Sequence, residues 1–307
     1  MVSSCTLADM ASDGKLRVGI VGASGFTGAE LMRLIAGHPD MELVVASGDT
    51  QAGTKVRSLY PNLAAEYGEM SYSEYRAPLF EGLDAVFLGL PHMASQPIVA
   101  DLFKKVGCVL DLGSDFRLKD PTLYSQWYQT EHLMPDLLDE FVYGLPELYR
   151  TDLKGARGVA VPGCYPTSAS LALSPFVQRE KIHLTGVIVD AASGVSGAGR
   201  APKADTTFAS VDENFNAYGL LTHRHTPEIE QVTGCQVLFT PHLAPMVRGI
   251  LATCYARPLE QSFSTEQALE LLEQFYSEEP FVVVLLRRLA VDVRAVGRDG
   301  RRGREGG

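Results

Sequence analysis

The sequence lacks several features that would point to a membrane or to nucleic acid. No apolar run approaches the roughly 20 residues of a membrane-spanning helix, so we expect no membrane protein. Basic residues are few, since 27 Lys and Arg against 37 Asp and Glu give a formal net charge of −10. Proteins that bind a phosphate backbone usually carry a basic face, so we expect no nucleic-acid partner.

Cysteine is also sparse, and its spacing excludes the usual disulfide and metal patterns. The five cysteines are odd in number, widely separated, and without CxxC or zinc-type clusters: Cys5, Cys108, Cys164, Cys235 and Cys254. The pattern predicts reduced thiols and no metal. Residues 1–14 lack the basic start and apolar stretch of a signal peptide. We therefore expect a cytoplasmic protein.

What is present is the composition of a folded protein of about two domains. The 307 residues are 46% hydrophobic and 21% charged, as in ordinary globular proteins. A chain of this length exceeds what one core usually organises. We predict an α/β protein with domains at 15–157 and 158–284, followed by a tail at 285–307.

The first domain begins with a strand, a glycine turn and a helix. The strand is predicted at 16–21 (LRVGIV), followed by GASGFTG and by an amphipathic segment with Leu31, Leu34 and Ile35. Gly22, Gly25 and Gly28 let backbone approach a pyrophosphate, and the helix start directs free amides at it. The pattern predicts dinucleotide binding, although glycine turns also join strands to helices elsewhere.

Alternating strands and helices after this turn predict a parallel, Rossmann-type sheet. Further strands are expected at 42–47, 84–90 and 108–111, with a helix at 95–105. NAD-selective sites often place an acidic residue at the end of the second strand, where this chain has Ser47 and Gly48. NADP is therefore favoured, with Lys55 and Arg57 nearby. The alternative is that all of these are ordinary loop residues.

Two loops at strand ends are candidates for ligand binding. One is Leu90-Pro91-His92, and the other is the GSDFR segment that contains Arg117. Arginine offers a planar fork that suits a carboxylate or a phosphate. On spacing alone, an ion pair of Arg117 with Asp115 or Asp120 is equally plausible.

Cys164 is the candidate nucleophile of the second half. It lies in PGCYPT, between a predicted strand at 158–161 and a predicted helix. Amides at a helix start lower a thiol's pKa and favour the reactive thiolate. The other four cysteines are interpreted as small buried apolar residues.

A thiolate usually works with an acid–base group, most often histidine. His223 and His225 precede a predicted helix in THRHTPEIEQ, and an extended approach would turn both side chains the same way. A solvated loop and a metal pair are the alternatives. A metal would need further ligands at suitable spacings, and none stands nearby.

Two more segments follow predicted strands at 185–189 and 237–240. DAASGVSGAGR, at 190–200, is too glycine-rich to be regular structure, so it is either a ligand loop or a flexible connector. PHLAPMVRG, before a strand predicted at 250–256, carries Arg248 as a second candidate anion ligand.

Seven segments in one order resemble a known enzyme family: GASGFTG, LPH, GSDFRL, PGCYPT, SGVSGAG, HRHTPEIEQ and PHLAPMVRGI. Together, over residues 16–284, they resemble N-acetyl-gamma-glutamyl-phosphate reductase, a relative of aspartate-semialdehyde dehydrogenase. The resemblance implies a Rossmann domain for NADP(H) and an α+β catalytic domain with a mixed sheet. It also implies reduction of the small-molecule acyl phosphate N-acetylglutamyl phosphate to the semialdehyde. We expect a homo-oligomer.

The resemblance also assigns roles to residues. Cys164 would attack the acyl phosphate and form a thioester, and His223, preferred over His225, would transfer the proton. Arg117 and Arg248 would hold phosphate and carboxylate. The cofactor would contact residues in four segments: Gly22, Ser24, Gly25, Phe26, Thr27 and Gly28; Ser47; Leu90 and Pro91; and Ser193, Gly194 and Gly197.

The end of the chain departs from the family. From Leu285 the sequence becomes rich in arginine and glycine, where relatives continue with strands and a helix. This composition predicts either a disordered basic tail or a C-terminus read in the wrong frame. Two alternative functions follow. One is a sibling reductase for aspartyl phosphate, and the other is a dinucleotide-binding protein whose catalysis is impaired by the altered end.

Overall fold

The computed structural model describes residues 14–285, and its first unit is a six-stranded parallel sheet. The order is β2-β1-β3-β4-β6-β5, and every neighbouring pair is parallel. The strands are β1 Leu16–Val21, β2 Met41–Ser47, β3 Ala85–Leu88, β4 Cys108–Asp111, β5 Phe141–Tyr143 and β6 Gly158–Ala160. The α-helices of this unit are α1 Phe26–Ala36, α2 Val56–Leu59, α3 Ala64–Tyr67, α4 Gln96–Leu102, α5 Thr122–Tyr128 and α6 Pro146–Leu153.

The second unit is a four-stranded mixed sheet in the order β10-β7-β9-β8. β7 and β9 are parallel, while β10 and β8 run antiparallel to their neighbours. The strands are β7 Val187–Ser193, β8 Asn216–Ala217, β9 Val237–Leu243 and β10 Ile250–Tyr255. The α-helices are α7 Cys164–Gln178, α8 Phe208–Val211, α9 Thr226–Thr233 and α10 Thr265–Phe275. The predicted fold class, a Rossmann-type sheet with a mixed-sheet catalytic part, is confirmed.

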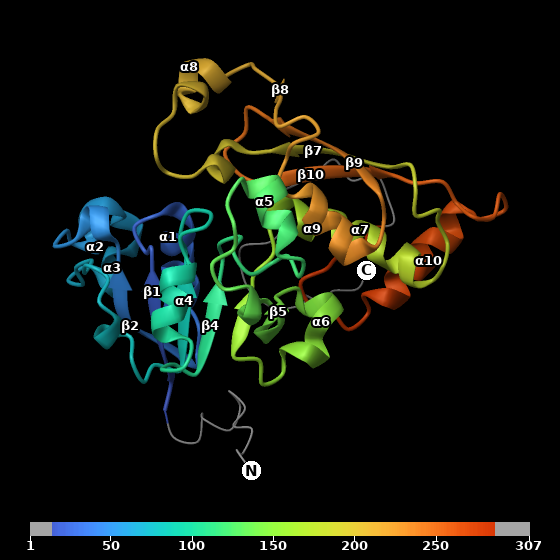
Figure 1. Cartoon of the computed structure of the whole chain (residues 1–307). Coiled ribbons are helices and arrows are strands. Elements are labelled where there is room, and N and C mark those ends of the chain that lie inside the picture. The colour runs from blue at the N-terminus through green and yellow to red at the C-terminus, as the bar shows by residue number, and fades with distance from the viewer. Residues whose placement is uncertain (1–13, 286–307) are drawn as a thin grey trace, which may run out of the picture.

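Helices α7 and α9 occupy the space between the second sheet and the first unit (Figure 1). Their apolar side chains, including Ala169, Leu173 and Ile229, pack with the inward residues of β7 and β9 in one buried cluster. The other side of α9 reaches the first unit, where Gln231 accepts a hydrogen bond from the Lys119 amide. Residues on α9 therefore lie against both units, which is where the candidate site forms.

The core of the first unit follows from the apolar strands read in the sequence. Val18 and Ile20 of β1 are fully buried, as expected for a central parallel strand covered on both faces. Gly19 between them faces Phe80 and Leu83, and a Cβ there would lie 2.8 Å from each side chain. The bulk of these neighbours therefore requires glycine in mid-strand.

Several predicted boundaries differ from the structure. The strand expected to open the second domain is β6, which pairs with β4 and β5 in the first sheet. Residues 190–193, predicted to be irregular, continue β7, because pairing with β9 and β10 satisfies their backbone groups. β9 likewise extends through Pro241 to Leu243.

Two expectations concern the whole chain. Across residues 14–285, no helix combines the length and apolar character needed to span a membrane. The predicted tail lies, from residue 286 on, outside the described residues.

Candidate active site

The glycine turn between β1 and α1 has a shape that only glycine permits. Gly22 has φ +83°, and a Cβ there would lie 2.3 Å from the carbonyl oxygen of Gly89. A Cβ on Gly28 would lie 2.4 Å from Cα of Ala23. α1 begins at Phe26 without a side-chain cap, so its first amides are free to face an anion. The turn therefore fits the pyrophosphate of a dinucleotide.

Unpaired hydroxyls gather where β2 ends. Ser47, Tyr72 and Ser73 each bury a side-chain oxygen that has no hydrogen-bond partner among residues 14–285. Gly48 lies against Ser24, and a Cβ on it would come within 2.8 Å of Ser24 Oγ. Buried hydroxyls normally have partners, so this group fits the polar part of a bound ligand.

The charged residues near the end of β2 already have hydrogen-bond or ion-pair partners within the protein. Asp49 accepts a hydrogen bond from the Tyr75 amide at 2.8 Å. Lys55 and Arg57 both pair with Glu69. The two cations that the sequence suggested for a phosphorylated ribose are thus bound to a carboxylate instead.

The loops after β3 and β4 are tied to each other by buried carboxylates. Asp115 accepts hydrogen bonds from the amides of Met93 at 2.6 Å and Ser95 at 2.9 Å. Asp111 accepts from Ser95 Oγ at 2.9 Å, and burial followed by the charge of Asp115 raises its pKa to about 7. Met93 has φ +62°, a strained angle for a side-chain residue. These contacts fix the LPH loop in place.

Cys164 is the first residue of α7 and is exposed to solvent. The atoms crowded around the thiol nevertheless desolvate it, and this burial raises its pKa. The amides of Tyr165 and Cys164 and the charge of Arg117 act in the opposite direction. The helix amides thus act in the direction that the sequence predicts, but desolvation outweighs them, so the net shift of the pKa is upward.

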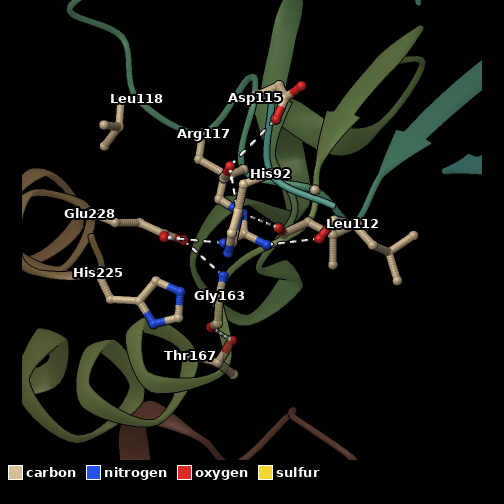
Figure 2. Close-up of polar contacts among 12 residues, drawn as sticks. His92, Leu112, Asp115, Arg117, Leu118, Gly163, Thr167, His225 and Glu228 are labelled. Carbon is tan, nitrogen blue, oxygen red and sulfur yellow. Dashed lines mark hydrogen bonds and ion pairs between the residues drawn. The ribbon is translucent and has the colours of Figure 1, made fainter. Parts of the chain in front are cut away.

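Glu228 of α9 holds the turn that precedes Cys164. One carboxylate oxygen, Oε1, accepts hydrogen bonds from the Gly163 amide at 2.8 Å and from the Tyr143 hydroxyl at 2.8 Å. The other, Oε2, lies 3.4 Å from Nη1 of Arg117. Figure 2 shows the carboxylate pointing between Arg117 and Gly163. Both charged side chains are buried.

Arg117 is held inside the protein by three hydrogen-bond partners. Its Nε donates to the carbonyl oxygen of Val161 at 2.8 Å, and its Nη2 donates to that of Leu112 at 2.9 Å. Of the two sequence interpretations of Arg117, ligand binding or an ion pair with Asp115 or Asp120, the structure shows an ion pair, but with Glu228. The predicted partners were neighbours in sequence, whereas the observed one is brought near by the fold.

The two histidines contact each other but not in the predicted way. Their ring centroids lie 4.8 Å apart, and His223 Nδ1 accepts a hydrogen bond from the His225 amide at 3.1 Å. His225 has helical backbone angles, so the segment turns instead of extending. Burial lowers the pKa of His223 to about 4 and lowers that of His225 well below its usual value. Both rings are therefore neutral near pH 7.

His225 lies directly against the nucleophile turn. A Cβ on Gly163 would come within 2.5 Å of His225 Nε2, so glycine is needed there (Figure 2). Tyr165, which follows Cys164, packs edge-on against both His223 and His225 at 5.6 and 5.8 Å. The structure thus brings Cys164 and the predicted histidines into one neighbourhood.

Known proteins match this chain over both units. The family description "Semialdehyde dehydrogenase, NAD binding domain" matches residues 17–156, and "Semialdehyde dehydrogenase, dimerisation domain" matches residues 164–300. N-acetyl-gamma-glutamyl-phosphate reductase of Symbiobacterium thermophilum is 48% identical over 276 residues, which cover 88% of this chain and 79% of that protein. The enzyme of the same name from Desulforamulus reducens is 46% identical, with 88% and 80% covered. The chain belongs to the N-acetyl-gamma-glutamyl-phosphate reductase family.

A solved structure extends the likeness of fold beyond that family. Aspartate semialdehyde dehydrogenase with NADP from Candida albicans matches with a TM-score of 0.62 at 14% identity, covering 86% of this chain and 76% of that one. The family match gives the chain a nicotinamide-dinucleotide domain and makes it an oxidoreductase.

The remaining predicted site residues lie in two places: beside the glycine turn, and in the SGVSGAG loop with the neighbouring Arg248 loop. Leu90 lies beside Gly22, since a Cβ on Gly22 would be 3.4 Å from its side chain. The SGVSGAG loop is hydrogen-bonded to the Arg248 loop, with the Gly194 amide donating to Gly249 and the Val195 amide to Met246, both at 2.9 Å. Arg248 itself reaches Glu30 of α1 at 3.4 Å. Both loops therefore lie on the side of the nucleotide turn.

Glu228 and Tyr143 are the residues that the sequence reading missed. Glu228 stands inside HRHTPEIEQ, but the sequence assigns it no role of its own. Glu228 lies in the first turn of α9, a place where glutamate is common. No local signal therefore marks it as buried. Its partners Gly163, Arg117 and Tyr143 are 65, 111 and 85 residues away in sequence.

We predict that Glu228→Gln makes Cys164 more reactive while destabilising the fold. Removing the Glu228 charge removes an influence that raises the pKa of the thiol, so the thiolate fraction near pH 7 increases. The buried Arg117 loses its counter-charge, which costs about 3 kcal/mol of folding free energy. Iodoacetamide alkylation of Cys164 against pH, and urea unfolding, measure the two effects.

The matched control is Glu69→Gln, which removes a carboxylate from a surface ion pair. Surface pairs contribute about 0–1 kcal/mol, so both measurements should stay near those of the parent. Slower alkylation of Cys164 in Glu228→Gln would contradict the assignment.

Proposed function

We propose that this chain reduces N-acetylglutamyl phosphate to N-acetylglutamate semialdehyde with NADPH and releases phosphate, a step of arginine biosynthesis. The observation that carries the proposal is the helix-start Cys164 beside two neutral histidines, in a chain up to 48% identical to enzymes named for this reaction. Solved aspartate semialdehyde dehydrogenases resemble it at 14–16% identity, which supports the shared fold and not their substrate.

The glycine turn at 22–28 would hold the cofactor pyrophosphate, with Ser24, Phe26 and Thr27 around the start of α1. Ser47 would face the adenosine ribose. Leu90, Pro91 and the loop of Ser193, Gly194 and Gly197 would border the nicotinamide. When bound, NADPH supplies the hydride that reduces the acyl group to the aldehyde.

Cys164 would act as the covalent nucleophile. Its sulfur attacks the acyl carbon, the bond from that carbon to the phosphate oxygen breaks, and phosphate leaves with the electron pair. The resulting thioester divides one difficult displacement into two easier steps. After reduction, the carbon–sulfur bond breaks, the aldehyde is released and the thiolate is restored.

The histidines would handle the protons. Because His223 Nδ1 accepts an amide hydrogen, its neutral ring carries the proton on Nε2, which suits donation to the substrate carbonyl oxygen. His225 lies against Gly163 and its Nδ1 has no partner within residues 14–285. We propose His225 as the base that takes the Cys164 proton and returns it to the sulfur once the carbon–sulfur bond has broken.

Reverse-direction turnover tests this function. We predict phosphate-dependent reduction of NADP by N-acetylglutamate semialdehyde, measured as absorbance of the reduced cofactor. Cys164→Ser should lower the rate by at least about 10³-fold, because the nucleophile is lost. Cys254→Ser, at a half-buried thiol of β10, is the control and should retain activity. Undiminished turnover by Cys164→Ser would remove the covalent step.

We propose NADP over NAD because a cation and free hydroxyls gather at the end of β2. Arg200 follows the SGVSGAG loop, and its charge opposes the burial that raises the pKa of Tyr60 and of Tyr72. Its charge therefore acts at the Tyr60 and Tyr72 hydroxyls, and we propose that the ribose 2′-phosphate binds between Arg200 and the unpaired Tyr72 hydroxyl. Lys55 and Arg57, paired with Glu69, are not needed.

Arg200→Gln tests this preference. We predict that the KM for NADP rises about 10-fold, the value of one charged hydrogen bond, while the KM for NAD is unchanged. Arg57→Gln is the matched control and should change neither constant. Equal increases for both cofactors would show that Arg200 does not contact the 2′-phosphate.

We propose that the chain forms a homodimer through the open face of the second sheet. Alternate residues of β7, β9 and β10 turn away from α7 and α9 and stay exposed, among them Ile188 at 37%, Leu238 at 49%, Leu251 at 63% and Tyr255 at 54%. These residues lie within the segment that matches the family's dimerisation domain. Exposed apolar patches of this kind usually mark protein interfaces.

A charge on this face should separate the subunits. We predict that Leu251→Glu converts dimer to monomer in sedimentation velocity, because an unpaired carboxylate at an apolar contact opposes association. Leu34→Glu, on the exposed side of α1, should leave the dimer intact. A dimeric Leu251→Glu would place the contact elsewhere.

A cytoplasmic location remains a prediction, supported by the four free thiols among the described residues. The alternative of a binding protein without turnover depended on the chain after 285, which lies outside the described residues from 286 on.

A further inference from the structure

Arg224 lies between His223 and His225 in the sequence, and its side chain extends toward the first unit. Its guanidinium carbon lies 5.2 Å from the ring centre of Tyr128, a residue of α5. The side chain is exposed, and no carboxylate of residues 14–285 lies within ion-pair distance of it. A cation–π contact orients the guanidinium but leaves its hydrogen-bond donors free.

The other cationic side chains near the site already have hydrogen-bond or ion-pair partners within the protein. Arg117 is buried and donates to Glu228, Val161 and Leu112. Lys119 donates through Nζ to the carbonyl oxygens of Leu138 and Phe141. Arg248 pairs with Glu30. Arg224 differs from Arg117 in its access to solvent, and from Arg117 and Arg248 in having no carboxylate partner among residues 14–285.

The surroundings of Arg224 belong to the candidate active site. The Tyr128 ring lies 5.9 Å from that of His92, whose Nδ1 is hydrogen-bonded to Ser114 at 2.9 Å. Burial, and then the charge of Arg224, lowers the pKa of both His92 and His223. Arg224 therefore lies near both neutral imidazoles, and His223 in turn contacts Tyr165 next to Cys164.

From this arrangement we infer that Arg224 binds the phosphate group that leaves the substrate, an assignment that rests on the proposed function. A planar guanidinium matches two phosphate oxygens at once. As the bond between the acyl carbon and the phosphate oxygen breaks, the oxygen keeps the electron pair and its growing charge faces Arg224. The exposed position lets the released phosphate exchange with solvent, whereas the buried Arg117 acts as a positioning residue.

The reverse reaction separates phosphate binding from the chemistry at Cys164. Without phosphate, semialdehyde and NADP should give one burst of reduced cofactor as the thioester accumulates. Phosphate then attacks the thioester carbon, the carbon–sulfur bond breaks and turnover continues. In Arg224→Gln we predict an unchanged burst and a KM for inorganic phosphate raised about 10- to 100-fold, the value of one or two charged hydrogen bonds.

Two further variants sharpen the result. Arg224→Lys keeps the charge but loses the fork, so its KM for phosphate should fall between those of the parent and Arg224→Gln. Arg179→Gln, at the opposite end of α7 from Cys164, should match the parent. Thermal unfolding of each variant shows whether its fold is intact.

Three outcomes would overturn the assignment. An unchanged KM for phosphate in Arg224→Gln removes the contact. A rise in the KM for semialdehyde or NADP with phosphate unaffected assigns Arg224 to another anion. Absence of both burst and turnover in the parent chain overturns the proposed function itself and this assignment with it.

Discussion

The site depends on one buried carboxylate, that of Glu228. It accepts hydrogen bonds from the amide of Gly163 and the hydroxyl of Tyr143 and lies beside the Arg117 guanidinium. A charge this deep is tolerated only when it is paired and hydrogen-bonded, so each partner is required by the others. Because Gly163 directly precedes Cys164, the same network that stabilises the charge fixes where the thiol stands.

The partners of the Glu228 carboxylate come from both units of the fold, so one site needs both sheets. Arg117 comes from the loop after β4, Gly163 from the end of β6, and Glu228 from α9 beneath the second sheet. The carboxyl ends of the parallel strands point their loops toward α7 and α9, as open α/β sheets do with their ligands (Figure 1). The nucleotide turn after β1 and the thiol after β6 both follow carboxyl ends of strands in the same parallel sheet, although 136 residues separate Gly28 from Cys164.

Local patterns allowed much of this to be predicted. The glycine turn, the strands around it and the helix that starts at Cys164 depend on residues close in sequence, and their types were read correctly. Pairings over long range were not predicted. Lys55 and Arg57 bind Glu69, and Arg117 binds Glu228 in place of the nearby Asp115 or Asp120. Sequence spacing predicts neighbours on one helix or strand, but not which distant element supplies a counter-charge.

The same limit applies to the thiol. A helix start predicted a lowered pKa for Cys164, and the amides do act that way, yet desolvation by the packed surroundings prevails. Burial also keeps His223 and His225 neutral. A protonated thiol beside a neutral imidazole is one proton transfer away from a thiolate and an imidazolium. An anionic substrate near Arg224 and the histidines would stabilise that imidazolium, so binding itself would favour the charged pair. In this proposed mechanism Cys164 and the two imidazoles are uncharged before binding, and the charge of the substrate favours their conversion to thiolate and imidazolium.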